Sequence, residues 1–197
     1  MGGLKEGENA SGYVVSQITS WFFTRGYRIR KRRRLEAQIR QLLFQLHEEL
    51  KGYGKEKGIS LGTTMTLFMT DGQYFYWCHA GDSRLYHLRH KRLRQLTKDN
   101  KEAEGALNQA IGVGEWRQPA GGWRRFLKGD RLLLCTDGFY RGLDEEDICT
   151  CLNGKLTQES QINRMLQQMG QRKLAMGERD NISALYCAKI GVRRANR

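Results

Sequence analysis

The sequence predicts an α+β protein in which an antiparallel sheet structure lies inside and pairs of helices lie outside. Two amphipathic segments come first, strand-like segments follow, and two further helical segments precede a closing strand. Four of the strand-like segments follow one another without a helix between them, so the βαβ rhythm of a parallel sheet is absent. A layered α+β fold is the class that this order favours.

The first two helices are predicted from the spacing of their apolar residues. Between residues 8 and 25, and again from Leu35 to Leu50, apolar side chains recur at steps of three and four, which is typical of amphipathic helices. Gly52 and Gly54 predict the end of the second helix.

A basic segment separates these two helices. The chain has 34 Lys and Arg against 21 Asp and Glu, a net charge of +13, and residues 28–34 hold six of these cations in seven positions. Such a segment can contact nucleic acid, an acidic lipid surface or a phosphorylated partner, but a solvated linker also accounts for it. We interpret residues 26–34 as a basic inter-helix segment within a single domain of residues 1–197.

The strands are predicted from alternation and turn residues. Residues 65–69, 74–78, 84–88 and 92–96 form an antiparallel meander of four strands, with its first turn at Asp71 and Gly72. We expect a buried strand at 132–135, a closing strand at 182–190, and helices at 101–110, 144–152 and 159–169. Gly121 and Gly122 predict a loop.

The cysteines and the hydropathy indicate an intracellular protein. Five cysteines occur without CxxC spacing, and three of them fall in apolar strand-like segments, which is typical of buried free thiols. The sequence has no apolar stretch of membrane-spanning length and no signal-peptide core. We therefore expect a cytoplasmic protein with no membrane span.

Three short acidic motifs, at 81–84, 136–138 and 179–181, stand at the edges of strand-like segments. Their carboxylates, Asp82, Asp137 and Asp180, could meet at one end of the sheet structure, where oxygen ligands suit Mg²⁺ or Mn²⁺. Gly138 allows a backbone or a ligand to approach Asp137 closely. Each motif taken singly is an ordinary turn.

Taken in order, the motifs resemble the PPM (PP2C-like) metal-dependent serine/threonine phosphatases over nearly the whole chain. The resemblance implies a four-layer α-β-β-α sandwich, in which helix pairs flank two antiparallel sheets. It rests on residues 62–64 (GTT), 81–84 (GDSR), 96–99 (LTKD), 110–112 (AIG), 129–138 (GDRLLLCTDG) and 180–183 (DNIS).

The resemblance also implies a function and a site. Asp137 and Asp180 are expected to be catalytic and to hold two Mg²⁺ or Mn²⁺ ions, while Asp82 holds a third ion, and Asn181 and Gly138 support these ligands. A metal-activated water would then hydrolyse phosphoserine and phosphothreonine on proteins, in signal transduction. The expected partners are phosphorylated proteins and a cognate serine/threonine kinase, nucleic acid is disfavoured, and the substrate-binding residues stay unassigned.

The start of the chain departs from the family pattern. Residues 1–3 match only the end of the family's Asp-Gly-x-Gly-Gly motif, so we expect an N-terminally incomplete domain that lacks the first strands and one metal-bridging carboxylate. Its loss leaves the repulsion between two divalent ions less compensated and impairs activity. The alternative is a catalytically inactive pseudophosphatase that acts as a binding or regulatory module.

Other patterns are weaker. Cys78 and Arg84 fit the Cys-x₅-Arg loop of cysteine-dependent phosphatases, but Asp82 would place a negative charge in that anion-binding loop, and Cys135 with Arg141 repeats the spacing. A metal pair of His87 and His90 is disfavoured by neighbouring cations, so both are predicted to be surface histidines. Trp116 and Trp123 are predicted to be packing residues.

Overall fold

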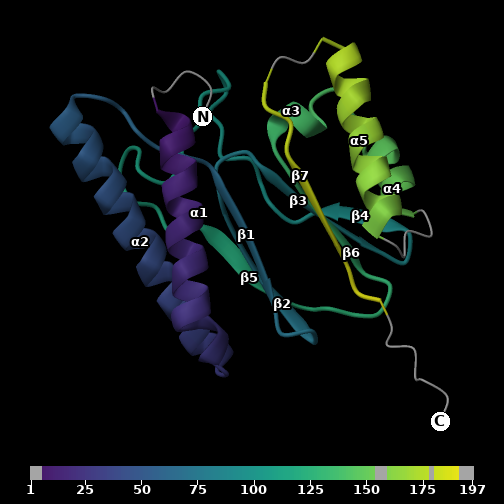
Figure 1. Ribbon diagram of the computed structural model, residues 1–197, viewed down its shortest axis with the longest axis horizontal. Coiled ribbons are helices and arrows are strands. Elements are labelled where there is room, and N and C mark those ends of the chain that lie inside the picture. The colour runs from purple at the N-terminus through teal and green to yellow at the C-terminus, as the bar shows by residue number, and fades with distance from the viewer. Residues whose placement is uncertain (1–5, 154–158, 178–179, 191–197) are drawn as a thin grey trace. The chain divides into compact units, whose positions relative to one another are not determined.

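The computed structural model describes residues 6–153, 159–177 and 180–190 (Figure 1). The contacts divide the chain into two compact units. The first is Met1–Leu67, Cys78–Gly81 and Asn100–Gly121, and the second is Phe68–Trp77, Asp82–Asp99 and Gly122–Arg197. The helices are α1 (Gly7–Thr24), the 3₁₀ helix η1 (Gly26–Arg28), α2 (Arg32–Lys57), α3 (Asp137–Tyr140), α4 (Glu145–Asn153) and α5 (Glu159–Ala175). The strands are β1 (Met65–Thr70), β2 (Tyr74–Ala80), β3 (Arg84–Arg89), β4 (Arg92–Gln95), β5 (Ala120–Arg125), β6 (Arg131–Cys135) and β7 (Ala184–Ala188).

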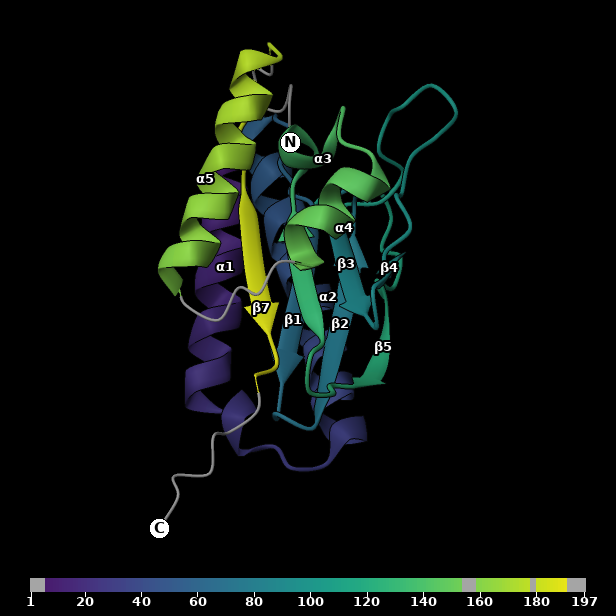
Figure 2. The ribbon, with the colours of Figure 1, turned by 90° about the vertical axis from the view of Figure 1, so that its right-hand side faces the viewer.

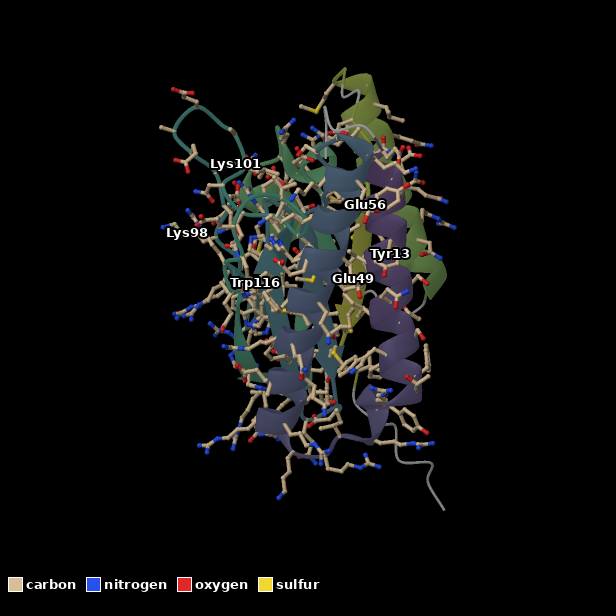
Figure 3. The ribbon with its side chains drawn as sticks, turned by 90° about the vertical axis from the view of Figure 1, so that its left-hand side faces the viewer. Tyr13, Glu49, Glu56, Lys98, Lys101 and Trp116 are labelled. Atoms are coloured by element: carbon tan, nitrogen blue, oxygen red, sulfur yellow. The ribbon has the colours of Figure 1, made fainter. Side chains whose placement is uncertain are left out.

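In the first unit, α1 and α2 lie side by side, and the Tyr13 hydroxyl donates a hydrogen bond to Glu49 Oε2 at 2.9 Å (Figure 3). The predicted apolar stripe of α2 is buried at Ile39, Leu43, Leu46 and Leu50. The predicted end of this helix was wrong, because α2 continues to Lys57.

The helix ends instead at Gly58, whose φ of +64° is the left-handed conformation that suits a glycine cap. Gly54 is tolerated inside the helix for a packing reason. A Cβ there would lie 2.8 Å from the carbonyl oxygen of Ile59.

Residues 101–110 do not form the predicted helix. Isolated bridges join Lys101 to Leu107 and Ala110 to Val113, and Gly105 has a φ of +86°. Turn hydrogen bonds satisfy the backbone groups here, including one from the Asn108 N–H to the Asn100 carbonyl at 2.9 Å. Tertiary and turn contacts therefore replace the helical ladder.

The four predicted strands exist, but they do not form one meander. Strands β1 and β2 belong to a three-stranded sheet of order β1-β2-β5, whereas β3 and β4 belong to a four-stranded sheet of order β4-β3-β6-β7. The chain changes sheet at Gly81, whose φ of +114° favours glycine and where a Cβ would lie 2.5 Å from Thr64. The predicted loop at Gly121 and Gly122 was also wrong, since both residues lie in β5.

The four-stranded sheet is antiparallel throughout, with Leu85 opposite Leu134 and Leu132 opposite Cys187. Helices α4 and α5 cover one face of it (Figure 2). Strand alternation sends one set of side chains to a core with these helices and another set to the opposite face. The helix-side core comprises Tyr86, Leu88, Leu133, Cys135, Phe139, Tyr140, Ile148, Leu152 and Met169, and the other face buries Phe75, Leu85, Phe126 and Leu132. The predicted α+β class with two antiparallel sheets and helices is confirmed.

A buried carboxylate, Asp130, joins β3 to the start of β6. It accepts hydrogen bonds from Arg89 Nε at 2.7 Å and from the Leu127 N–H at 2.7 Å. His87 Nε2 lies 3.3 Å from Asp130 Oδ2, and the side chain of His87 is only 5% exposed. The prediction of a surface histidine was wrong for His87, because the register of β3 turns it inward against Phe75, whereas His90 is exposed.

The two tryptophans are packing residues, as predicted. Trp116 contacts Phe44 and His47 edge-on, and Trp123 packs against Tyr76. Among the helices of the described part of the chain, none has the length and apolarity that crossing a membrane would need.

Candidate functional site

Asp137 stands where buried strand β6 ends and α3 begins. The preceding residue, Thr136, is fastened to the start of β7, because its N–H donates to the Ser183 carbonyl at 3.0 Å and its Oγ1 accepts from the Ser183 N–H at 3.1 Å. The same hydroxyl donates to the Asn181 carbonyl at 3.2 Å. This junction places the segment that carries Asp137 beside the segment that carries Asp180.

Gly138 makes this approach possible. A Cβ at Gly138 would lie 2.6 Å from the carbonyl oxygen of Asn181 and 3.4 Å from that of Asp180. Real Cβ atoms are not found 2.6 Å from a carbonyl oxygen, so the two backbones can pass this closely only with glycine at this position.

The two carboxylates have similar local supports. Asp137 Oδ1 accepts the N–H of Gly138 at 3.0 Å, and Asp180 Oδ1 accepts the N–H of Asn181 at 2.8 Å. Asp137 Oδ2 also lies 2.5 Å from Arg141 Nη2, one helical turn further on. Asp180 is exposed, and the Asp137 side chain is 20% exposed, so solvent reaches both groups.

Asp82 is buried in the turn between β2 and β3. Its backbone carbonyl accepts a hydrogen bond from the Tyr140 hydroxyl at 3.1 Å, which ties it to α3. The guanidinium of Arg84 lies 3.7 Å from the centre of the Tyr140 ring. Arg84 is held in turn by Asp99, at 3.0 Å from Nε to Oδ1 and 2.8 Å from Nη2 to Oδ2.

The electrostatics keep Tyr140 a hydrogen-bond donor. Burial raises the pKa of Tyr140 well above its ordinary value, and the nearby carboxylates of Asp99, Asp82 and Asp137 raise it further. Burial alone would lower the pKa of Arg84, but hydrogen bonds with Asp99 and the Tyr86 hydroxyl raise it instead. Negative charge therefore gathers around a protonated phenol and a charged guanidinium.

Backbone contacts link the segments that carry the three predicted ligands, but the side chains do not form a complete metal site. Within residues 6–153, 159–177 and 180–190, no three His, Cys, Asp or Glu side chains converge into a ready metal site. The backbone brings Asp137 and Asp180 together, and Tyr140 links Asp82 to α3. The solvent-accessible carboxylates of Asp137 and Asp180 fit Mg²⁺ or Mn²⁺, since Mg²⁺ keeps several waters and takes only one or two protein carboxylates.

Several residues of the site were not found from the sequence. Thr136 and Arg84 lie inside the predicted motifs, but their roles in joining strands and stacking on Tyr140 depend on tertiary contacts. Asp99 lies inside the motif at 96–99, but its ion pair with Arg84 could not be predicted from sequence. Tyr140 and Arg141 carried no sequence signal for a role in the site beyond their nearness to the motif at 136–138. The partial motif at residues 1–3 lies outside the described residues.

The geometry does not support the cysteine-phosphatase alternative. Residues 78–84 run from β2 through a turn into β3, so no helix follows Arg84 to complete an anion-binding loop. Burial raises the pKa of Cys135 to about 12, which keeps that thiol protonated and unreactive. Cys78, Cys135, Cys149 and Cys187 form no disulfide.

Two relatives represent the sequence similarities. The serine/threonine phosphatase stp of Listeria monocytogenes is 25% identical over 207 residues, which cover 94% of this chain and 80% of the relative. The serine/threonine protein phosphatase PstP of Mycobacterium tuberculosis is 31% identical over 110 residues, which cover 47% of this chain. The matched part spans only 21% of the length of PstP.

Solved structures of other proteins share the fold of this chain. PppA, a key regulatory component of T6SS in Pseudomonas aeruginosa, aligns with a TM-score of 0.81 and 26% identity over 94% of this chain and 81% of that one. The catalytic domain of PstP, in complex with two manganese ions, aligns with a TM-score of 0.77 and 25% identity over 94% of this chain and 83% of that one. A family model described as protein phosphatase 2C matches residues 2–179, and this chain therefore belongs to the protein phosphatase 2C family.

Proposed function

We propose that this chain hydrolyses phosphoserine and phosphothreonine on proteins with the help of Mg²⁺ or Mn²⁺. The observation that carries the proposal is the junction of Thr136 and Gly138 with the start of β7, which sets Asp137 beside Asp180. Support also comes from the relatives, which are named as serine/threonine phosphatases, and from the two manganese ions of the PstP structure.

Asp137 and Asp180 would hold the two ions, and Asp82 would hold a further one. When bound, the ions supply a water nucleophile of lowered pKa and neutralise charge on the phosphoryl oxygens. The chain's own residues orient these ligands. Tyr140 holds the backbone of Asp82, and the N–H groups of Gly138 and Asn181 hold one oxygen each of Asp137 and Asp180.

The substrates we propose are phosphorylated proteins, and a cognate serine/threonine kinase would supply them. The lack of disulfides at Cys78, Cys135, Cys149 and Cys187 supports action in a reducing compartment such as the cytoplasm.

The test is Mn²⁺-dependent hydrolysis of a phosphothreonine peptide by the 197-residue chain and by Asp137→Asn. Residues that only orient a metal ligand typically contribute about 10–100-fold. Removing a ligand should therefore lower kcat/KM by at least about 100-fold. The matched control is Asp147→Asn, since Asp147 pairs with Arg172 on the surface of α4 and should leave activity within about twofold. Near-normal turnover in Asp137→Asn would overturn the assignment.

An inactive binding module is the second candidate, and the ion pair between Asp137 and Arg141 favours it. The Arg141 guanidinium occupies Oδ2, so it competes with a metal for this oxygen. If the folded chain shows no turnover and no Mn²⁺ binding by calorimetry, while Arg141→Gln gains Mn²⁺ binding, this second function replaces the first.

A further inference from the structure

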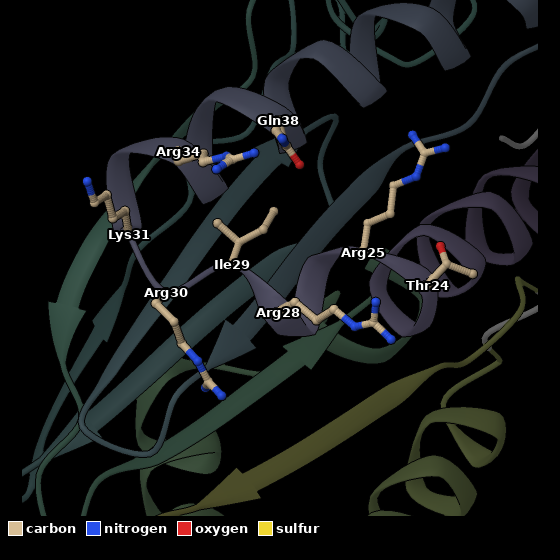
Figure 4. Close-up of a pocket in the computed structure, with 8 residues that line it drawn as sticks. All are labelled: Thr24, Arg25, Arg28, Ile29, Arg30, Lys31, Arg34 and Gln38. Carbon is tan, nitrogen blue, oxygen red and sulfur yellow. The ribbon is translucent and has the colours of Figure 1, made fainter.

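A basic hollow lies at the junction of α1, η1 and α2, within the first unit (Figure 4). Its volume is about 660 Å³. Five of its eight lining residues are cationic, and none is acidic. The lining comprises Thr24, Arg25, Arg28, Ile29, Arg30, Lys31, Arg34 and Gln38.

In the part of the chain that the structure describes, no carboxylate neutralises the five cations of the basic hollow. All five are exposed, and among the described residues none of them forms an ion pair with a carboxylate. The guanidinium of Arg28 donates from Nε to the hydroxyl of its neighbour Tyr27, at 2.7 Å, and lies over the ring of that residue. Like charges gathered in this way repel one another, and a bound polyanion would relieve that repulsion.

The start of α2 lacks the acidic and capping residues that normally stabilise the first turn of a helix. Its first turn contains Arg32, Arg33 and Arg34 and no acidic residue, and Lys31 provides no side-chain cap. The positive end of a helix dipole disfavours cations and favours anions. Cations at this position destabilise the helix, and such unfavourable local features are typical of functional surfaces.

The turn that presents these cations has a defined structure. The Ile29 N–H donates to the Gly26 carbonyl at 3.0 Å, and the Arg28 N–H donates to the Arg25 carbonyl at 3.2 Å. Gly26 is buried against Trp21, where a Cβ would lie 2.8 Å from the indole ring. The cations therefore extend from a packed turn.

The arrangement of the cations and the exposed aromatic rings beside them indicate the kind of partner that the basic hollow would bind. The labelled cationic side chains fan out around Ile29 in Figure 4, an arrangement that suits many spaced negative charges better than one compact anion. The same segment exposes aromatic rings, with Phe23 69% and Tyr27 47% exposed.

We propose that the basic hollow and Phe23 form a docking surface for an anionic lipid bilayer. Lipid phosphates would meet the cations, and Phe23 would rest at the boundary between headgroups and acyl chains. Nucleic acid would match the charges, but it offers no apolar layer for Phe23, and one face of the Tyr27 ring already carries Arg28. This proposal does not depend on the proposed phosphatase activity.

The experiment is sedimentation of the 197-residue chain with vesicles of phosphatidylglycerol and phosphatidylcholine, beside vesicles of phosphatidylcholine alone. We expect binding only to the anionic vesicles. The variant Arg28→Gln/Arg30→Gln/Arg34→Gln should lose about fivefold in partitioning for each cation, roughly 100-fold in all. Phe23→Ser should weaken partitioning without changing its salt dependence.

The matched control, Lys91→Gln/Arg92→Gln/Arg94→Gln, removes the same charge from the exposed β3–β4 hairpin. This control should retain most of the vesicle binding. An equal loss in the control would overturn the proposal, because binding would then depend on the net charge of the chain and not on the basic hollow. Failure of the unmodified chain to bind anionic vesicles would overturn it directly. Tighter binding to RNA than to vesicles at equal phosphate concentration would assign the surface to nucleic acid instead. If the triple variant does not fold, Arg30→Gln alone must show the fivefold loss.

Discussion

Tyr140 connects Asp82 to the helix that begins at Asp137. Its hydroxyl satisfies the Asp82 carbonyl, its ring carries the Arg84 guanidinium, and the residue is only 5% exposed. A buried carbonyl that loses its donor has no water to replace it. We therefore interpret Tyr140 as a residue that positions a metal ligand.

The residue-scale prediction is that Tyr140→Phe destabilises the fold by about 1–3 kcal/mol, because the buried Asp82 carbonyl loses the hydrogen bond from the Tyr140 hydroxyl. It should also raise the Mn²⁺ concentration for half-maximal activity by about 10-fold or more, as loss of a ligand-orienting contact does. Urea unfolding and Mn²⁺ titration measure the two effects.

The matched control for this change is Tyr186→Phe. The hydroxyl of Tyr186 is buried and has no hydrogen-bond partner among the described residues, so its removal should leave stability unchanged or raise it. If both substitutions cost the same, the hydrogen bond to Asp82 does not account for the effect.

At the scale of elements, the site depends on how closely α3 approaches the segment before β7. Gly138 sets that distance, because a Cβ would collide with the Asn181 carbonyl oxygen at 2.6 Å. Both neighbours of the contact are backbone atoms, so no flexible side chain can give way. The spacing of Asp137 and Asp180 is therefore controlled by one missing methyl group.

We predict that Gly138→Ala costs about 1–3 kcal/mol of stability through overpacking and lowers the affinity for Mn²⁺. Thermal unfolding and calorimetric Mn²⁺ titration would measure this. The matched control is Gly170→Ala in α5, where a Cβ meets nothing within 4 Å and should stabilise the helix by up to about 1 kcal/mol. Unchanged Mn²⁺ binding in Gly138→Ala would contradict the role of this approach.

At the scale of the whole molecule, buried ionisable groups set the pH range of stability. Burial lowers the pKa of His87 and of His47 below their ordinary value of 6.5. Burial alone would raise the pKa of Asp130, but hydrogen bonds from Arg89 and the Leu127 N–H lower it below 3.8. In all three cases the unfolded chain binds protons more readily than the folded chain.

Stability should therefore be greatest above about pH 7 and should fall as the pH drops below about 6.5, where unfolded histidines gain protons that the folded ones resist. A second decline should begin near pH 4, as unfolded Asp130 becomes protonated. The net charge of +13 increases the repulsion in acid. Urea midpoints between pH 3 and 8 measure both declines.

Two histidine variants test which residue causes the first decline in stability. His87→Gln should reduce the slope between pH 6.5 and 5, whereas His90→Asn, at an exposed turn position with a φ of +50°, should retain it. A flat profile between pH 5 and 7 in the unmodified chain would contradict the effect of burial.

The sequence by itself determined the α+β class, most of the helices and strands, and the order of the acidic motifs. These features depend on hydrophobic periodicity and on residue types within short stretches of the sequence. The apolar stripe of α2, the buried strand β6 and the closing strand β7 are examples. The Asp-bearing motifs were recognisable because their residue types recur in a set order along the chain.

The tertiary structure decided what depends on distant neighbours. Gly54 stays inside α2 because of packing against Ile59, residues 121–122 join a strand because β2 is available to pair with it, and the chain changes sheets at Gly81. His87 is buried because the register of β3 turns it inward, and Tyr140 meets Asp82 across 58 positions of sequence. Local periodicity carries no information about contacts at such separations, so only the folded chain reveals them.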